Sequence, residues 1–208
     1  MNPLRFLHKL LIGPERYKWE KEYAAGRWDY LHEPAQAERY KVLLDFVYRY
    51  LQGNRAILEI GCGEGILQSR MLPGVYSRFL GIDISHVAIR KAARLQDAIT
   101  RYCTGDMENY VPPGKYAMII FNEVLNYSTD PLRTVRRYLP YLEADGHLLF
   151  SLNETSWSRE IIQNLEKAFL LVDEKRTTKE RGAWHCKLYS QTQPDAPFPN
   201  ALQPVDLG

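Results

Sequence analysis

The period of the hydrophobic positions changes along this chain near residue 55. Before that point, Leu43, Phe46 and Val47 repeat at the spacing of one helical face, which predicts an amphipathic helix over residues 35–51. After it, short apolar runs alternate with amphipathic stretches that turn residues separate. Such alternation is typical of an α/β domain with a doubly wound, mostly parallel sheet.

Seven strands are expected in the alternating region. We predict them at residues 56–60, 79–84, 101–104, 116–121, 147–152, 169–175 and 183–190, with helices from the first loop to 72 and at 85–96, 130–142 and 157–168. Residues 176–182, between the last two strands, leave no room for a crossover helix. The final strand should therefore run antiparallel to its partner.

Both ends of the chain differ from this middle part. Residues 1–34 are rich in aromatic and charged side chains, and we expect a helical segment that folds over the domain as a lid. Its first apolar run is too short and too interrupted by charge for a signal peptide or a membrane span. Residues 191–208 contain four prolines and little periodicity, which predicts an extended tail. Residues 35–190 would form the single folded domain.

The composition is that of an ordinary globular domain. With 208 residues, 45% of them hydrophobic and 25% charged, the chain can bury a sizeable core. The net charge of +2 is not concentrated in a Lys/Arg stripe, so no nucleic-acid partner is expected. The three cysteines lack the spacing of a metal or redox site, which indicates reduced thiols, no metal and a cytoplasmic location. We expect a monomer or a homodimer.

A glycine-rich loop, Glu59-Ile60-Gly61-Cys62-Gly63-Glu64-Gly65, follows the first predicted strand. Glycines allow a tight turn and close approach of a ligand to the backbone, and the free N–H groups that follow can bind it. Taken alone, the loop is equally compatible with a structural turn or with many nucleotide ligands.

Polar residues also follow the second, third and fourth strands. Asp83 lies 22 residues beyond Gly61, where a carboxylate can accept hydrogen bonds from both ribose hydroxyls. Asp106 can accept from the exocyclic amine of adenine, with Met107 against the ring; the alternative is a solvated loop carboxylate. The segment 122–127, Asn-Glu-Val-Leu-Asn-Tyr, comes directly after an apolar strand. Because parallel strands end at one edge of the sheet, these residues should meet there.

Together these segments resemble the class I S-adenosylmethionine (SAM)-dependent methyltransferase family over roughly residues 35–190. The resemblance implies a Rossmann-like fold with an antiparallel seventh strand, SAM as methyl donor and S-adenosylhomocysteine as product. The cofactor-binding residues that it and the strand-end positions suggest are Glu59, Gly61, Gly63, Asp83, Ile84, Asp106, Met107, Asn122 and Val124, with Tyr30 closing over them. Asp145-Gly146-His147-Leu148-Leu149-Phe150 resembles the family's fifth-strand motif.

The acceptor side is expected to combine residues 17–30 with residues 122–127. Within the family, the second segment looks most like small-molecule methyltransferases, including nodulation-type N-methyltransferases of chitooligosaccharides. Many relatives in quinone biosynthesis carry His where this chain has Tyr127, so their acceptor chemistry does not transfer. Candidate substrate-binding residues are Tyr23, Trp28, Asn126 and Tyr127, and Trp19 is a further lid candidate. Each lid aromatic could instead fix the N-terminal helices to the core.

Two residues are candidates for catalysis. Glu123, directly after the fourth strand, is the better placed general base for a hydroxyl acceptor, whereas a neutral amine needs none. His185, on the last strand, is the second candidate, although the sequence favours a structural histidine there.

We expect a methyltransferase that acts on an oxygen or nitrogen atom of a small molecule, and two alternatives remain. A non-catalytic SAM-binding protein would carry the same cofactor motif. A nicotinamide-dependent oxidoreductase is disfavoured because the third glycine of its loop would fall at Ile66. A nucleic-acid methyltransferase is disfavoured by the absence of an Asn-Pro-Pro-Tyr tetrad after the fourth strand.

Overall fold

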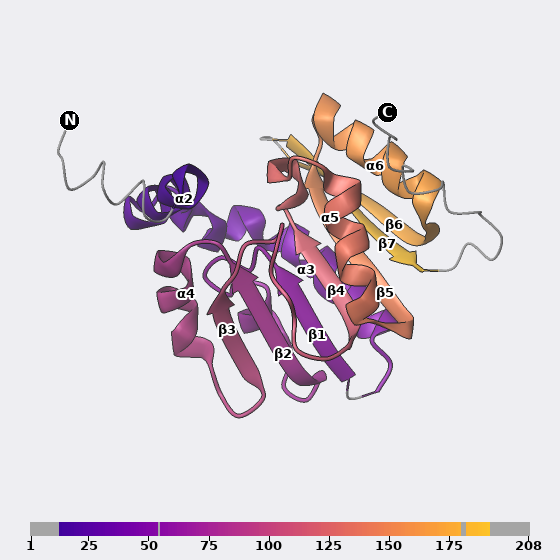
Figure 1. Ribbon diagram of the computed structural model, residues 1–208, viewed down its shortest axis with the longest axis horizontal. Coiled ribbons are helices and arrows are strands. Elements are labelled where there is room, and N and C mark those ends of the chain that lie inside the picture. The colour runs from indigo at the N-terminus through magenta and orange to yellow at the C-terminus, as the bar shows by residue number, and fades with distance from the viewer. Residues whose placement is uncertain (1–12, 54, 180–181, 192–208) are drawn as a thin grey trace, which may run out of the picture.

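The computed structural model describes residues 13–53, 55–179 and 182–191, which form a sheet between two layers of helices (Figure 1). The strands are β1 (Arg55–Ile60), β2 (Tyr76–Asp83), β3 (Thr100–Thr104), β4 (Tyr116–Asn122), β5 (Leu142–Asn153), β6 (Leu170–Lys179) and β7 (Gly182–Ser190). Their order across the sheet is β3-β2-β1-β4-β5-β7-β6. The strands β1 to β5 pair in parallel, and β7 pairs antiparallel with both β5 and β6. The predicted Rossmann-like sheet with a reversed last strand is therefore confirmed.

The described helices are α2 (Pro14–Ala24), α3 (Ala37–Tyr50), α4 (His86–Ala92), α5 (Pro131–Tyr138) and α6 (Ser156–Ala168). Three of them begin at a side-chain cap, because Ser85, Asp130 and Thr155 accept hydrogen bonds from the first turns of α4, α5 and α6. Short 3₁₀ turns include η1 (Asp29–His32), η3 (Gln68–Arg70), η4 (Ala93–Leu95) and η5 (Leu125–Tyr127). None of the helices in the described part of the chain is long and apolar enough to cross a bilayer.

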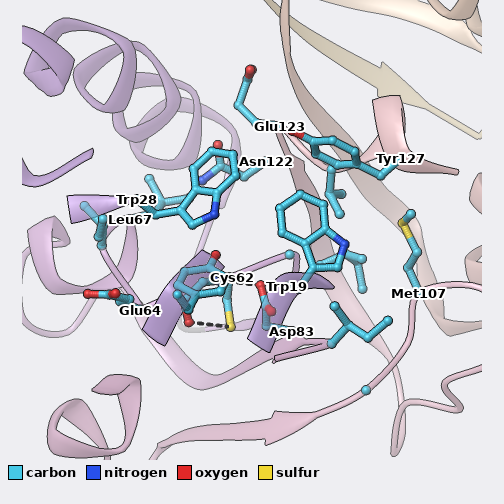
Figure 2. Close-up of a pocket in the computed structure, with 18 of the residues that line it drawn as sticks. Trp19, Trp28, Cys62, Glu64, Leu67, Asp83, Met107, Asn122, Glu123 and Tyr127 are labelled. Atoms are coloured by element: carbon cyan, nitrogen blue, oxygen red, sulfur yellow. Dashed lines mark hydrogen bonds between the residues drawn. The ribbon is translucent and has the colours of Figure 1, made fainter. Parts of the chain in front are cut away.

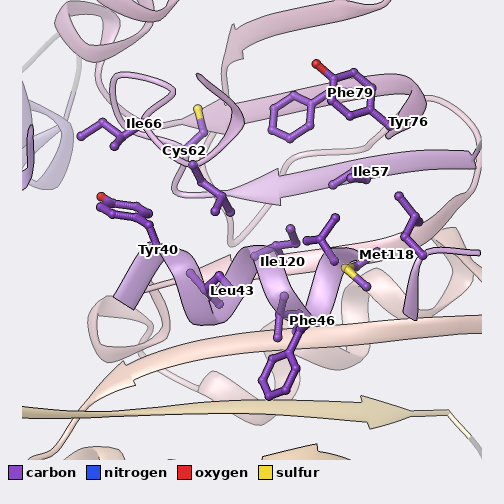
Figure 3. Packing of buried hydrophobic residues seen from close by; sticks show 14 of the residues in the cluster. Tyr40, Leu43, Phe46, Ile57, Cys62, Ile66, Tyr76, Phe79, Met118 and Ile120 are labelled. Atoms are coloured by element: carbon purple, nitrogen blue, oxygen red, sulfur yellow. The ribbon is translucent and has the colours of Figure 1, made fainter. Parts of the chain in front are cut away.

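Alternate residues of the central strands face opposite helical layers, as the pleat of a strand requires. Ile57 and Ile120 pack with Leu43 and Phe46 of α3 on one face (Figure 3). The neighbouring residues of these strands, such as Leu58, pack against α5 and α6 on the other face. Because β4 is buried on both faces, it reads in the sequence as one unbroken apolar run. The carboxyl ends of β1, β2 and β4 are thereby held at one rigid edge.

The helix expected after the glycine loop, as far as residue 72, is not formed. The chain makes turns there and then only the η3 turn. Gly61, Gly63 and Gly65 all have positive φ, at 72°, 54° and 78°, and a run of such residues cannot continue a right-handed hydrogen-bond ladder.

Other boundaries differ by fewer residues or lie outside the described part. The helix expected at residues 85–96 is shorter: α4 ends at Ala92, and only the η4 turn follows it. β5 begins before the Asp145-Gly146 turn that we expected ahead of it, because Leu142 already pairs with Tyr116 of β4. The part of the expected helical segment before residue 13, and the predicted extended tail beyond residue 191, lie outside the described residues.

Candidate active site

A cavity lies at the carboxyl edge of the sheet, between the strand ends and the N-terminal segment (Figure 2). It encloses about 1220 Å³ of empty space, counted out to its open mouth. The predicted cofactor residues that line it are Gly61, Gly63, Asp83, Ile84, Asp106, Met107, Asn122 and Val124. The predicted acceptor-side residues that line it are Trp19, Tyr23, Trp28, Glu123 and Tyr127. The fold thus brings together residues that the sequence separates by about a hundred positions.

Four predicted site residues do not line the cavity. Glu59 is fully buried beneath it and reaches the wall only through Asn122. Tyr30 is an exposed residue whose ring lies 6.1 Å from that of Trp28. Asn126 uses its amide to join Asn153 and Ser158, and His185 on β7 lies 3.8 Å from a Glu154 oxygen. Tyr30, Asn126 and His185 therefore do not line the cavity, and their predicted roles stay predictions.

Close packing of the loop explains why positions 61 and 63 are occupied by glycine. The backbone N–H groups of Gly61 and Cys62 both donate to the carbonyl oxygen of Ile82, which draws the loop against β2. A Cβ atom at Gly61 would lie 2.7 Å from the side chain of Val124, and one at Gly63 would lie 2.9 Å from the Tyr23 hydroxyl. The backbone therefore forms the cavity floor directly, where a ligand can contact it.

Asp83 is held by the backbone at the end of β2. Its Oδ2 accepts from the N–H of Gly63 at 3.0 Å, and its Oδ1 accepts from the N–H of Ser85 at 2.8 Å. Burial raises the pKa of the Asp83 carboxyl to about 6, although both hydrogen bonds act to lower it. A carboxylate has about four lone-pair positions, so two remain for hydroxyl donors of a ligand in the cavity.

A chain of hydrogen bonds crosses one end of the cavity. Arg39 Nη1 donates to Asn122 Oδ1 at 2.7 Å, and Asn122 Nδ2 donates to Glu59 Oε1 at 3.0 Å. Burial raises the pKa of the Glu59 carboxyl to about 8, against the lowering effects of Asn122 and Arg39. Sequence reasoning missed Arg39, because nothing in its local pattern distinguishes it from Arg49, a surface residue of the same helix.

Three buried polar atoms of this group have no hydrogen-bond partner among the described residues: Trp28 Nε1, Arg39 Nε and Glu59 Oε2. Most buried polar atoms in proteins are satisfied, so such a group indicates a missing ligand. Two of the three atoms are donors and the third is an acceptor. Trp28 and Arg39 line the cavity, so a ligand carboxylate fits the two donors, and the methionine end of SAM carries a carboxylate; Glu59 lies behind Asn122, where an ammonium group would fit.

Glu123 combines an unusual backbone with an unusual charge environment. Its φ of 57° is the only positive value of a non-glycine residue in the described chain, a conformation that costs about 1–3 kcal/mol. Its oxygens accept from the Ser151 hydroxyl at 2.6 Å and from the N–H of Asn153 at 3.2 Å. Burial raises the pKa of the Glu123 carboxyl, although Arg39 and these hydrogen bonds oppose the effect. Strain and desolvation at a cavity wall are features of functional residues.

The helix α2 closes the cavity from above. Its Trp19 ring packs edge-on against Tyr127, with centroids 4.6 Å apart, and lies 5.6 Å from Trp28. The next residue, Glu20, accepts hydrogen bonds from the backbone N–H groups of His86 at 2.8 Å and Val87 at 3.1 Å. A carboxylate at a helix N-terminus is favoured by the free N–H groups and by the helix dipole. Glu20 therefore fastens the expected lid to the first turn of α4.

A second attachment joins the segment after α2 to the glycine loop. Glu64 pairs with Lys91 at 2.6 Å and with His32 at 2.9 Å, and Lys91 also lies 3.5 Å from Asp29. These pairs hold the η1 turn beside the loop.

The Glu20 attachment can be tested without any ligand. In Glu20→Gln, the amide nitrogen would face one of the two backbone donors, and the charge that the α4 N-terminus favours would be lost. Because hydrogen bonds to charged groups are worth about 1.5–3 kcal/mol, we expect backbone amides of residues 14–24 to exchange at least about tenfold faster. Hydrogen-exchange mass spectrometry would measure this, with Glu22→Gln on the same helix as the control. Equal exchange in the two variants would contradict the attachment.

A glycine turn, a buried acid on the next strand and a cavity at the edge of a doubly wound sheet define a nucleotide-cofactor domain. A family model of the methyltransferase domain matches residues 31–193. The chain belongs to this family, and its fold is that of class I SAM-dependent methyltransferases. Family membership assigns SAM as its cofactor, which the unpartnered atoms and Asp83 fit. Family membership also excludes the nicotinamide-dependent oxidoreductase that was one of the alternatives.

Individual relatives agree in fold and differ in acceptor. Malonyl-[acyl-carrier protein] O-methyltransferase 1 of Ilyobacter polytropus is 29% identical over 62% of this chain and 52% of its own length. Ubiquinone biosynthesis O-methyltransferase of Proteus mirabilis is 28% identical over 73% of this chain and 65% of its own length. The N-methyltransferase NodS of Bradyrhizobium japonicum superposes with a TM-score of 0.67 at 21% identity, over 77% of this chain and 98% of NodS. The chain thus spans about half to two thirds of the length of the two O-methyltransferases.

Proposed function

We propose that this protein transfers a methyl group from SAM to a nitrogen or oxygen atom of a small molecule. The observation that carries the proposal is the set of unpartnered atoms at one end of the cavity, with Asp83 on the neighbouring strand. The rest of the cavity is walled by aromatic side chains of α2 and of the segment after β4, which supports a separate subsite for the acceptor.

Each part of the cofactor has a matching group in the cavity. The carboxylate would accept from Arg39 Nε and Trp28 Nε1, and the ammonium group would donate to Glu59 Oε2. An ammonium group at this position would also keep Glu59 ionised, despite its raised pKa. The ribose hydroxyls would donate to Asp83. The adenine ring would lie among Ile84, Asp106 and Met107.

The protein's contribution to the reaction is mainly alignment and exclusion of water. SAM, when bound, supplies a methyl carbon that is open to in-line displacement from a positive sulfur. The glycine loop and Asp83 fix that end of the cavity, while Trp19, Trp28 and Tyr127 bound the space from which an acceptor would approach. Orientation of this kind can be worth about 7–11 kcal/mol of the barrier. The α2 lid keeps water from the site, which strengthens the electrostatic interactions inside it.

Calorimetry with SAM and S-adenosylhomocysteine tests the cofactor half of the proposal. We expect Arg39→Gln to weaken SAM binding at least about tenfold, because it removes a charged donor to the carboxylate. Arg49→Gln, on the same helix but paired with Asp45 and Asp173 at the surface, is the matched control. Equal SAM affinity in the two variants would rule out the proposed orientation of the cofactor.

The acceptor half needs a measurement of methyl transfer. The protein and radiolabelled SAM would be incubated with the low-mass and the macromolecular fractions of a bacterial extract. We expect label to enter the low-mass fraction and S-adenosylhomocysteine to accumulate with it. Labelling confined to the macromolecular fraction would overturn the small-molecule assignment. Tight SAM binding without product in either fraction would favour a non-catalytic SAM-binding protein.

A further inference from the structure

Aromatic rings form one continuous wall on the acceptor side of the cavity. The Trp28 ring lies 5.6 Å from Trp19 and 6.2 Å from Tyr23, and Trp19 packs on Tyr127 at 4.6 Å. Figure 2 shows Glu123 next to Tyr127, on the side of the cavity away from the glycine loop. Ring faces of Trp and Tyr carry partial negative charge, so a wall of this kind attracts cations. The ammonium group of Lys18 already lies 5.0 Å from the centre of the Trp19 ring.

Charged residues of the cavity wall are strongly biased towards acids. The carboxylates are those of Glu15, Glu64, Asp83, Asp106, Glu108 and Glu123, and the one cationic side chain in the described wall is Arg39. Arg39 is bonded to Asn122 and lies at the methionine end of the proposed cofactor site. The wall as a whole is therefore acidic. Among the described residues, the cation nearest to the acceptor-side rings is Lys18, whose ammonium group lies 5.0 Å from the centre of the Trp19 ring and 5.9 Å from that of Tyr127.

Glu123 lines the cavity beside the ring of Tyr127 and forms no described ion pair, although the charge of Arg39 acts to lower its pKa. Glu64 is paired with the basic side chains of Lys91 and His32, whereas Glu108, like Glu123, accepts only from neutral donors, the Thr134 hydroxyl and the Thr129 N–H. Glu123 has only neutral donors among the described hydrogen bonds. A desolvated carboxylate is costly unless it is protonated or paired, and a cation bound beside Glu123 would favour its ionised form.

We propose that the methyl acceptor is an amine that enters as its ammonium ion and is held between the rings of Trp19, Trp28 and Tyr127 with Glu123 as its counter-ion. The inference rests on the proposed function above and narrows the acceptor from oxygen or nitrogen to nitrogen. A carboxylate acceptor would be repelled by Glu123. A neutral alcohol would leave the charge of Glu123 uncompensated.

The chemistry of such an acceptor balances with the groups present. The ammonium ion R–NH₃⁺ first gives one proton to the Glu123 carboxylate, whose raised pKa makes it a better proton acceptor than an ordinary glutamate. The nitrogen lone pair of R–NH₂ then forms the bond to the methyl carbon, and the carbon–sulfur bond breaks with its electron pair left on sulfur. The products are R–NH₂⁺–CH₃ and neutral S-adenosylhomocysteine. Glu123 returns its proton to water when the lid opens.

A matched pair of probes separates charge from shape. Choline and 3,3-dimethylbutan-1-ol have nearly the same shape, but only choline is a cation. Each would be titrated into the full chain saturated with S-adenosylhomocysteine, and binding would be followed by tryptophan fluorescence. We expect choline to bind at least about tenfold more tightly than the alcohol. Equal affinities, including failure of both probes to bind, would overturn the proposal.

Variants of the cavity wall test which side chain causes the preference for choline over the alcohol. Glu123→Gln should remove most of the preference for choline, whereas Glu108→Gln, a carboxylate of the same wall, should keep it. An equal loss in both variants would mean a diffuse negative field rather than a counter-ion, and would overturn the assignment to Glu123. Trp19→Leu provides a second test if Glu123→Gln does not fold, because it should reduce the preference by removing a ring. Failure of the proposed function is distinguishable, since the protein would then not bind S-adenosylhomocysteine at the start of the titration.

Discussion

Alanine at position 61 is expected to destabilise the protein and to weaken SAM binding at least about tenfold. A side chain at the φ of 72° of Gly61 costs about 1–2 kcal/mol, and a Cβ atom 2.7 Å from Val124 forces the loop or the segment after β4 to move, which costs about 1–3 kcal/mol more. That movement displaces the backbone that forms the cavity floor. Urea unfolding would measure the first effect and calorimetry the second.

Gly74→Ala is the matched control for this prediction. Gly74 has a φ of 79°, and no atom lies within 4 Å of a Cβ built there. The variant should therefore show only the backbone cost of about 1–2 kcal/mol, with unchanged SAM affinity. If Gly61→Ala bound SAM as tightly as Gly74→Ala, the glycine loop would not contact the cofactor as proposed.

Replacing Asp83 by asparagine is expected to have the second large effect. The carboxylate accepts from two backbone N–H groups, and an amide can present its oxygen to only one of them. One donor then faces an NH₂ group, which costs about 1–3 kcal/mol, and the ribose loses its charged acceptor. We expect SAM affinity to fall at least about tenfold. Asp97→Asn is the control for the loss of a carboxylate outside the cavity wall. Asp97 accepts from the N–H groups of Ile99 and Thr100 with the same oxygen, so the amide oxygen can keep both bonds and SAM affinity should not change.

The raised pKa of Asp83 gives this prediction a pH signature. Only the ionised carboxylate accepts from both backbone donors and from ribose hydroxyls, so SAM binding favours the deprotonated form. With a pKa of about 6 in the free protein, SAM affinity should fall as the pH drops below that value. In Asp83→Asn the part of the fall that begins near pH 6 should be absent, and only the dependence that comes from Glu59, whose pKa is about 8, should remain. A wild-type affinity that stays constant down to about pH 5 would contradict a ribose role for Asp83.

The mostly parallel sheet and the place of the site were predictable from sequence for a topological reason. Parallel strands covered on both faces appear as unbroken apolar runs, as β4 does, and they all end at one edge of the sheet. A polar residue that directly follows such a run, such as Asp83 or Asn122, must therefore lie at that edge. The short 176–182 connection likewise left only an antiparallel pairing for β7.

Local propensity misled at the glycine loop, where Gly61, Gly63 and Gly65 have positive φ. The stretch after Gly65 has apolar residues at helical spacing, which predicted a helix to residue 72. The loop instead takes its shape from its contacts with β2, Val124 and Tyr23, none of which is near it in sequence. Tertiary contacts here outweigh a propensity that amounts to less than about 1 kcal/mol per residue.

The sequence alone determined the class of fold, the edge at which a ligand binds and the glycine loop and acids that meet a nucleotide. It could do so because these features depend only on strand order and on position relative to a strand end. Only the tertiary structure decided which side chains face the cavity. Arg39 lines it and Arg49 does not, although both belong to α3, and Asn126 turns away to Asn153 while Tyr127 stays. The physical reason is that these directions follow from how α3, α2 and the η5 turn pack on the sheet, and that packing is fixed by contacts distant in sequence.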